Sequence, residues 1–299
     1  MRKVNKHVEF LQGADILTFK LLVRYGATYV IFPLALLLAF PTHAVDLRWF
    51  ELVSEDVNSI KPFYEKAFGW EIRPSKTRGA WIASLQGKDI AGISQIDTVQ
   101  DEIQESQWFP VLYVADIRAA AASLASHDAE FVEQIAEVDD YGSYTVIRDP
   151  QGSILMLTDI EAIPPANETP GNWLWGELWT NDADGSAQFY DGVAGLFAGQ
   201  IDAPGGGAYD VFAYGDELVA GMVAIDDAQF ATRWGGYIGV LNLDTTVAEI
   251  KRLGGEVFDA QINQHGAGRV AVVADPIGAV FFIYEMSPEQ IEPGKDAIQ

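Results

Sequence analysis

The run WFELVSED, which starts at Trp49, alternates apolar and polar positions as a strand does. Successive side chains of an extended strand point to opposite faces, so Trp49, Glu51 and Val53 share one face. Phe50 and Leu52 share the other face. Because both faces carry apolar residues, we expect other elements to cover this strand on both sides. A glutamate that lies between a tryptophan and a valine on one of those faces needs an explanation.

A helix is predicted directly after this strand. Asp56 stands where the helix begins, and the apolar residues of IKPFYEKAFGW recur at helical spacing. Pro62 is expected early in the helix, where its missing donor costs least, and Gly69 is expected to end it.

One further helix and six strand-like runs follow. The helix covers Ile117–Ser126, and the strands are predicted near Trp81–Leu85, Ile90–Ile96, Val111–Val114, Phe131–Ile135, Tyr144–Ile147 and Ile154–Leu157. The turn RDPQGS separates the last two strands. We interpret the order as βαβββ followed by βαβββ.

The pattern occurs twice in the chain, at a separation of 126 positions. WFELVSED returns as WGELWTND from Trp175, which makes Glu177 the counterpart of Glu51. Other equivalent pairs are Asp56 and Asp182, Tyr64 and Tyr190, Gly69 and Gly195, Trp108 and Trp234, and Asp149 and Asp275. A constant offset over this distance indicates an internal duplication. We predict a first copy at 46–160, a proline-rich linker at 161–172, a second copy at 173–286 and a polar tail at 287–299.

Residues 1–44 differ from the rest, because a basic start precedes the apolar run YVIFPLALLLAF. This layout predicts a secretory signal that is cleaved near Ala44, and hence a secreted or periplasmic protein. The alternative is a membrane anchor formed by residues 25–44, which are long enough to reach across a bilayer. A wrongly assigned start codon is the third reading, and in each case the segment is left out of the fold.

Charge and cysteine content exclude several classes of function. The formal net charge is −24 at pH 7, and the chain has no cysteine. An acidic surface repels phosphate backbones and anionic lipid headgroups, so neither nucleic acid nor a membrane is expected as a partner, apart from the N-terminal segment. Disulfides, thiol nucleophiles and thiolate metal sites are impossible. The duplicated copies can pair within one chain, so we expect a monomer.

Three repeated motifs resemble one known family. The strand that ends at Asp56, the helix PFYEKAFGWE and the turns DPQG and DPIG are similar to those of the vicinal oxygen chelate superfamily, which includes glyoxalase I, extradiol dioxygenases and bleomycin or fosfomycin resistance proteins. The resemblance covers nearly all of residues 46–286. It implies an α+β fold in which each copy has two βαβββ units, whose curved mixed sheets surround a cup with the helices outside.

The resemblance also implies positions for metal ligands, and this chain departs from the family there. Two histidines and a glutamate usually bind a divalent metal in the cup. The matching residues are Trp49, Phe109 and Met156 in the first copy and Trp175, Gly235 and Phe282 in the second. None of them offers an imidazole nitrogen or a carboxylate oxygen. We therefore expect neither a metal nor another cofactor.

Large apolar residues at these positions predict an aromatic-lined cup for a small organic ligand. The candidate pocket residues are Trp49, Glu51, Phe109, Tyr113, Met156, Trp175, Glu177, Trp179, Tyr237, Phe282 and Tyr284. The alternative is that these side chains interlock and fill the cup as an ordinary core.

Glu51 and Glu177 are the candidate functional acids. A glutamate among tryptophans must be paired, hydrogen-bonded or protonated with a raised pKa. The two carboxyls either anchor a ligand or act as general acid and base, and paired copies would bring them close enough to couple their titrations. In the alternative hypothesis each accepts a bond from an indole or a backbone N–H and only stabilises the docking of the copies.

The rim of the cup differs between the copies, which makes it a candidate for ligand choice. Its residues are Tyr141 and Arg148 in the first copy and His265 and Arg269 in the second. The leading hypothesis is an exported, metal-independent module that binds a small aromatic or amphipathic molecule. The alternatives are an enzyme of lyase or isomerase type that uses Glu51 or Glu177, by themselves or as ligands of a non-standard metal site, and a ligand-free structural scaffold.

Overall fold

The computed structural model describes residues 24–25, 28–29, 47, 49–76, 79–96, 103, 105–138, 142–160, 169–191, 196–203, 206–228, 231–262 and 268–291. Before the first copy, β1 (Arg24–Tyr25) and β2 (Thr28–Tyr29) form a short antiparallel pair. The rest of the apolar run after Tyr29, and the predicted cleavage position near Ala44, lie outside the described residues. Within the described residues, no helix has the length and apolarity needed to cross a membrane.

The first copy forms one mixed sheet of eight strands in the order β4-β5-β6-β3-β7-β10-β9-β8. Its first unit consists of β3 (Phe50–Ser54), α1 (Val57–Phe68), β4 (Glu71–Pro74), β5 (Ala80–Leu85) and β6 (Lys88–Gln95). Its second unit consists of β7 (Gln107–Tyr113), α2 (Ile117–Ala125), β8 (Glu130–Val138), β9 (Gly142–Arg148) and β10 (Ile154–Thr158). The units join where β3 pairs with β7 in antiparallel fashion.

The second copy repeats this arrangement in the order β12-β13-β14-β11-β15-β18-β17-β16. Its units are β11 (Trp173–Thr180), α3 (Ala183–Tyr190), β12 (Leu196–Asp202), β13 (Ala208–Tyr214) and β14 (Glu217–Ala224), and then β15 (Arg233–Val240), α4 (Leu243–Arg252), β16 (Glu256–Ile262), β17 (Arg269–Ala274) and β18 (Val280–Glu285). The short helix α5 (Pro288–Ile291) follows. The predicted α+β fold and its internal duplication are confirmed.

One strand of the first copy escaped the sequence prediction. The interval between α1 and β5 contains β4, whose only buried residue is Ile72. The strand predicted near Val111–Val114 is part of β7, which opens the second unit. A four-residue edge strand that contains a proline and three exposed side chains has no hydrophobic alternation to detect.

The ends of α1 follow local chemistry. The Asp56 carboxylate accepts bonds from the amides of Asn58 and Ser59, and Gly69 ends the helix with a φ of 74°. The prediction that Pro62 lies early in the helix is wrong, because Pro62 is the sixth helical residue and lies beyond the first turn. The helix therefore lacks one amide hydrogen bond in its interior.

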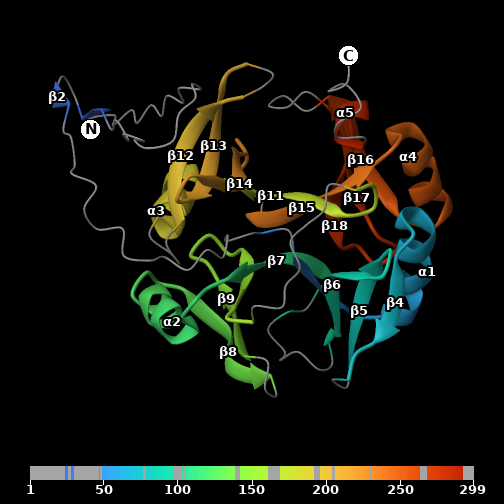
Figure 1. The fold of residues 1–299 in the computed structure, drawn as a ribbon, viewed down its shortest axis with the longest axis horizontal. Helices are drawn as coiled ribbons and strands as arrows, with labels where there is room; N and C mark the ends of the chain where they lie inside the picture. Colours follow the sequence, from blue (N-terminus) through green and yellow to red (C-terminus); the bar gives the residue numbers. More distant parts are fainter. Residues whose placement is uncertain are drawn as a thin grey trace, which may run out of the picture.

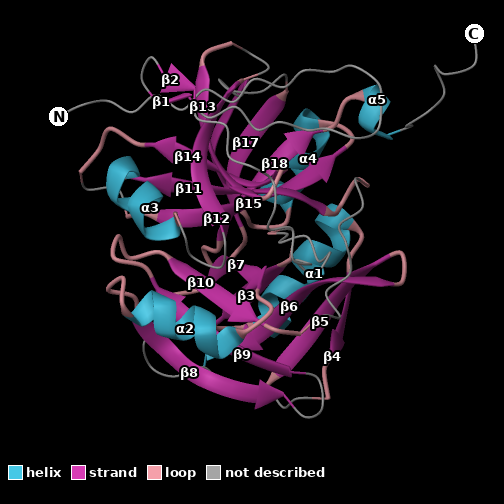
Figure 2. Ribbon diagram, turned by 60° about the vertical axis from the view of Figure 1, so that its left-hand side comes forward, coloured by secondary structure: helices cyan, strands magenta, loops and turns pink. Residues whose placement is uncertain are grey.

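The two sheets stand back to back, as Figure 1 shows, with the first copy below and the second above. Helices α1 and α4 lie together on one side of the molecule, and α2 and α3 lie on the other, an arrangement that is also visible in Figure 2. We call the helix-covered face of each sheet its back face and the opposite face its cup face.

Each side of the molecule has a hydrophobic core that both copies build. The first core joins α1 and the back of β3–β6 to α4 and the back of β15, β17 and β18, and the second joins α2 and its strands to α3 and its strands. A third, smaller cluster belongs to the cup face of the first copy alone. Because the back faces share cores, the two cup faces point away from each other.

The repeated motifs join the copies through two matched polar networks. The Tyr64 hydroxyl on α1 donates to the Asp275 carboxylate of the other copy at 3.0 Å and accepts a bond from the Trp108 indole at 2.7 Å. The equivalent Tyr190 hydroxyl donates to Asp149 at 2.8 Å. Burial raises the pKa of Asp275 to about 6. The aspartates of the two DP turns thus receive bonds from the opposite copy, with near-twofold symmetry.

Candidate ligand site

The positions that correspond to the family's metal ligands lie together on the cup face of the first copy. Glu51 pairs across the sheet with Phe109 on one side and with Gly92 on the other. Met156 lies on the next strand, beside Val111. The register thus brings Trp49, Phe109 and Met156 around Glu51.

These residues do not fit a metal ion. An indole, a phenyl ring and a thioether occupy the three positions of the first cup, and none of them is a ligand that holds a hard or borderline divalent cation. Within the described ranges, no group of three or more His, Cys, Asp and Glu side chains is placed to hold a metal.

Glu51 has an unusual environment for a carboxyl. Its Oε1 accepts one hydrogen bond, from the Trp49 indole at 3.1 Å. Among the described residues, no donor reaches its Oε2. The carboxyl lies against the Cα of Gly92, where a Cβ would collide with both oxygens, so a side chain at this position would force the carboxyl to move. Burial raises the pKa of Glu51 from 4.5 to about 7, and the bond from Trp49 opposes this rise.

A second acid lies on the same face. The Tyr144 hydroxyl on β9 donates to the Glu133 carboxylate on β8 at 2.7 Å. The pKa of Tyr144 is raised by burial first, then by this bond and by the charges of Glu133 and Glu51. The influence of Glu51 on Tyr144 indicates that Tyr144, Glu133 and Glu51 share one region of the cup.

Apolar side chains form the rest of this cup face. Val53, Phe109, Val132, Val146 and Ile154 are buried in a single cluster. Ile103, from the connection between β6 and β7, packs onto them. Trp49, Glu51, Ala80 and Ile82 remain only partly buried, so the accessible side of this cup lies toward β5.

The cup face of the second copy is organised differently, because its own side chains saturate Glu177. This carboxylate is buried and accepts bonds from the Trp179 indole at 2.7 Å, the Tyr209 hydroxyl at 2.5 Å and the Tyr237 hydroxyl at 2.5 Å. Burial first and the charge of Glu177 second raise the pKa values of both tyrosines, so both stay protonated as donors.

Stacked rings fill the space around Glu177. Phe282 stacks on Tyr237 with centroids 4.6 Å apart and lies 4.8 Å from Trp179. Gly235 makes room for the Phe282 ring, since a Cβ there would collide with it. For this copy, the structure favours the hypothesis of a filled core.

The two glutamates lie in different sheets, and each accepts the indole N–H that the alternative hypothesis proposed. They lie on separate cup faces that point away from each other, and the pKa of Glu51 is set by burial and by Trp49. The hypothesis of coupled titration is therefore wrong. Each glutamate does accept an indole N–H, but within its own sheet, so neither contributes to the docking of the copies.

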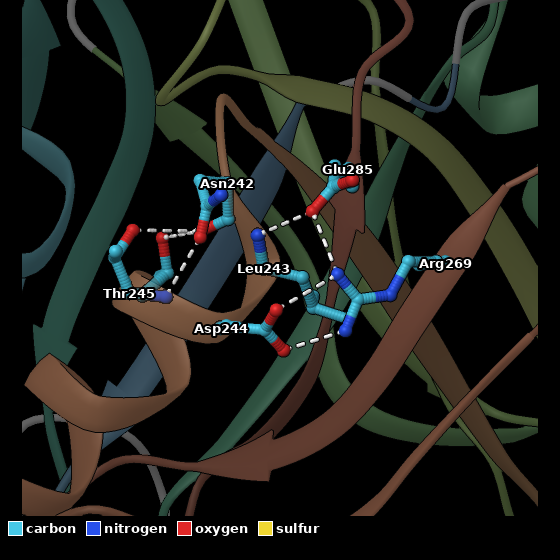
Figure 3. A network of polar contacts seen from close by, with 7 residues as sticks. Asn242, Leu243, Asp244, Thr245, Arg269 and Glu285 are labelled. Carbon is cyan, nitrogen blue, oxygen red and sulfur yellow. Dashed lines mark hydrogen bonds and ion pairs between the residues drawn. The ribbon is translucent and has the colours of Figure 1, made fainter.

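The rim residues are engaged in structural contacts where they are described. Arg269 pairs with Asp244 at 2.5 Å and with Glu285 at 3.3 Å, and Glu285 also accepts the Leu243 amide at the start of α4 (Figure 3). Arg148 pairs with Glu130 at 3.4 Å. Tyr141 and His265 lie outside the described residues. The remaining pocket candidates, Tyr113 and Tyr284, are partly buried at the ends of β7 and β18.

The raised pKa of Glu51 predicts a pH-dependent stability. A carboxyl whose pKa is higher in the folded state stabilises the fold fully below pH 4.5, and this contribution is lost as the pH rises through about 7. Urea unfolding should show the wild type losing about 3 kcal/mol relative to Glu51→Gln between pH 4.5 and 8. Asp149 and Asp275 titrate in both proteins and cancel in the difference. A constant difference across this range would show that Glu51 has an ordinary pKa.

Comparison with known proteins places these observations in a family. Residues 46–157 match the family model of the Glyoxalase/Bleomycin resistance protein/Dioxygenase superfamily. CFP32 of Mycobacterium bovis, whose name describes a candidate glyoxylase, is 28% identical over 250 residues, which cover 81% of this chain and 95% of CFP32. The anthracycline biosynthesis protein DnrV of Streptomyces peucetius is 30% identical over 129 residues, which cover 38% of this chain and 47% of DnrV.

Solved structures share the fold at low identity. The Mn(II)-bound glyoxalase from Novosphingobium aromaticivorans has a TM-score of 0.54 and 13% identity, with 82% of this chain and 83% of that chain covered. The 2,2',3-trihydroxybiphenyl 1,2-dioxygenase from Sphingomonas wittichii strain RW1 has a TM-score of 0.55 and 11% identity, with 81% and 90% covered.

The fold and the repeated βαβββ units define a two-copy, glyoxalase-like protein. The first copy, residues 46–157, matches the Glyoxalase/Bleomycin resistance protein/Dioxygenase superfamily, also called vicinal oxygen chelate, and a solved glyoxalase shares the fold of both copies.

Proposed function

We propose that this protein, exported by means of its N-terminal segment, binds a small aromatic or amphipathic molecule in the first cup without a metal ion. The observation that carries the proposal is the Glu51 carboxyl, which lies among Trp49, Phe109 and Met156 with one oxygen lacking a donor among the described residues. An apolar, aromatic surface with one polar group is typical of small-molecule sites. The second cup, whose acid is saturated, serves as scaffold.

The relatives are compatible with such a ligand. Two of them carry names that connect them with anthracycline biosynthesis, and anthracyclines are aromatic. Family membership by itself does not define the ligand, because function resides in the site rather than in the fold.

A thermal-shift screen of aromatic metabolites tests the proposal, since a ligand of the native state raises its apparent stability. We expect at least one compound to raise the Tm of the wild type, with and without a chelator. Glu51→Gln should reduce that shift. Glu177→Gln should lower the Tm of the free protein but leave the ligand-induced shift unchanged. A shift that vanishes in Glu177→Gln and survives in Glu51→Gln would assign binding to the other cup.

One observation favours a second candidate, an enzyme of lyase or isomerase type. A carboxyl with a pKa of about 7 is matched to proton transfer near neutral pH. Turnover of a ligand found in the screen, lost in Glu51→Gln while binding is retained, would support this candidate over simple binding.

A further inference from the structure

The two cups can be compared position by position, because the strand registers are equivalent. Glu51 lies opposite Gly92, which pairs with Ile82 on β5. Glu177 lies opposite Gly221, which pairs with Val211 on β13. Ala80 precedes Ile82 by two residues, and Tyr209 precedes Val211 by two residues. Tyr209 of the second cup therefore corresponds to Ala80 of the first.

In the second cup, Tyr209 forms the middle of a hydrogen-bonded chain. The Trp175 indole donates to its hydroxyl at 3.1 Å, and the hydroxyl donates to Glu177 at 2.5 Å. The hydroxyl lies directly over Gly221, where a Cβ would collide with it. The phenol group of Tyr209 thus lies over Gly221, between an indole donor and a carboxylate acceptor.

The first cup keeps both ends of this chain and lacks the middle. Trp49 is the counterpart of Trp175, and Glu51 is the counterpart of Glu177. With alanine at position 80, the Trp49 indole bonds directly to Glu51, whose carboxyl has moved onto Gly92. The donor and the acceptor of a phenol are both present, and they bond to each other where no phenol is provided. A phenol hydroxyl over Gly92 requires the Glu51 carboxyl to swing away from that glycine, as Glu177 lies away from Gly221.

This part of the first cup is accessible, in contrast to the deeper part. Trp49, Glu51, Ala80 and Ile82 are partly exposed. Val111, which replaces the second tyrosine donor Tyr237, is 2% exposed. A ligand can therefore reach the position that corresponds to Tyr209 but not the one that corresponds to Tyr237.

We propose that the first cup takes a phenol, whose ring lies over Ala80 and whose hydroxyl accepts a bond from Trp49 and donates one to Glu51. The ligand supplies the group that Tyr209 supplies in the second copy. This inference rests on the proposed function and names the chemical class of its ligand.

The charged residues on the cup face of the first copy disfavour an aromatic acid as the ligand. Glu51 and Glu133 are both carboxyls, and Tyr144 is engaged by Glu133. Arg73 lies on β4, beside Ile82 of β5. It donates to both oxygens of Asp89 at 2.7 and 2.8 Å. Arg148 is held by Glu130. The two arginines described on this face are thus each paired with a carboxylate. A ligand with a neutral hydrogen-bond donor is therefore favoured over an anionic ligand.

Isothermal titration of the full chain with 2-naphthol, 2-methoxynaphthalene and naphthalene tests the proposal. The three probes share the ring system, and only 2-naphthol carries a hydroxyl donor. A bond to a carboxylate predicts that 2-naphthol binds at least about tenfold more tightly than the methoxy compound. Glu51→Gln should reduce this preference, whereas Glu71→Gln, an exposed change on β4, should leave it intact.

Two reciprocal variants test the geometry. Ala80→Tyr places a phenol in the first cup and should abolish 2-naphthol binding there. Tyr209→Ala removes the phenol from the second cup and should create a second site for 2-naphthol. Both positions are partly exposed, and circular dichroism shows whether each variant folds. If one variant fails to fold, the other decides.

The outcomes separate this inference from the proposed function. Equal affinity for the three probes, or 2-naphthol binding that survives Ala80→Tyr, would overturn the phenol assignment while leaving ligand binding in place. If aromatic metabolites and all three probes fail to bind, the proposed function fails as well.

Discussion

Trp173→Ala is expected to lower the free energy of unfolding by about 3–5 kcal/mol. Trp173 opens the second copy and is fully buried between the two sheets. Its ring lies 4.4 Å from Phe50, 4.9 Å from Trp108 and 5.8 Å from Trp70 by centroid distance, and all three belong to the first copy. The substitution would leave a large cavity at the junction of the copies. Equilibrium unfolding in urea measures the loss.

Two further variants make this result interpretable. The Trp173 indole N–H is buried without a hydrogen-bond partner in the described structure, so Trp173→Phe removes an unsatisfied donor while keeping a ring. We expect it to cost less than half as much as the alanine variant. Phe258→Ala, at a ring that is 54% exposed, should change stability by at most about 0.5 kcal/mol. A comparable loss at positions 173 and 258 would contradict the shared core.

Glu177→Ala is expected to destabilise the protein by about 3 kcal/mol, because it deprives one buried donor and two partly buried donors of their common acceptor. The Trp179 indole and the Tyr209 and Tyr237 hydroxyls all bond to this carboxylate. Urea unfolding at pH 7 measures the effect, and near-ultraviolet circular dichroism reports on the stacked rings around it.

The matched control is Glu51→Ala in the first cup. Among the described residues, Glu51 accepts one hydrogen bond, and it is partly protonated near pH 7, so its removal should cost much less than that of Glu177. Equal losses from the two substitutions would show that the cups are organised alike, and both the saturated network and the phenol inference would then fail.

Much of the fold could be predicted from the sequence because its signals are local or repeated. The alternation in WFELVSED placed Glu51 on the cup face, and Asp56 and Gly69 marked the ends of α1. The edge strand β4 was missed, since one buried residue in four carries no periodicity. The length of a strand and its polarity thus limit what pattern analysis can find.

The role of the repeated motifs was outside the reach of a single sequence. Tyr64, Trp108 and Asp275 were recognised as members of equivalent pairs, yet their common network joins positions far apart in the chain. Hydrogen bonds between copies depend on how the back faces dock, and that docking is decided by the packing of two shared cores.

The sequence by itself determined the duplication and the α+β class, because residue type and spacing suffice for these. Only the tertiary structure decided that the cups face apart, that Glu177 is saturated and that Glu51 is not. The partners of a buried carboxyl come from neighbouring strands: Tyr209 and Tyr237 reach Glu177 from β13 and β15, while Ala80 and Val111 leave Glu51 with Trp49. Strand pairing brings such residues together, and one sequence does not specify it.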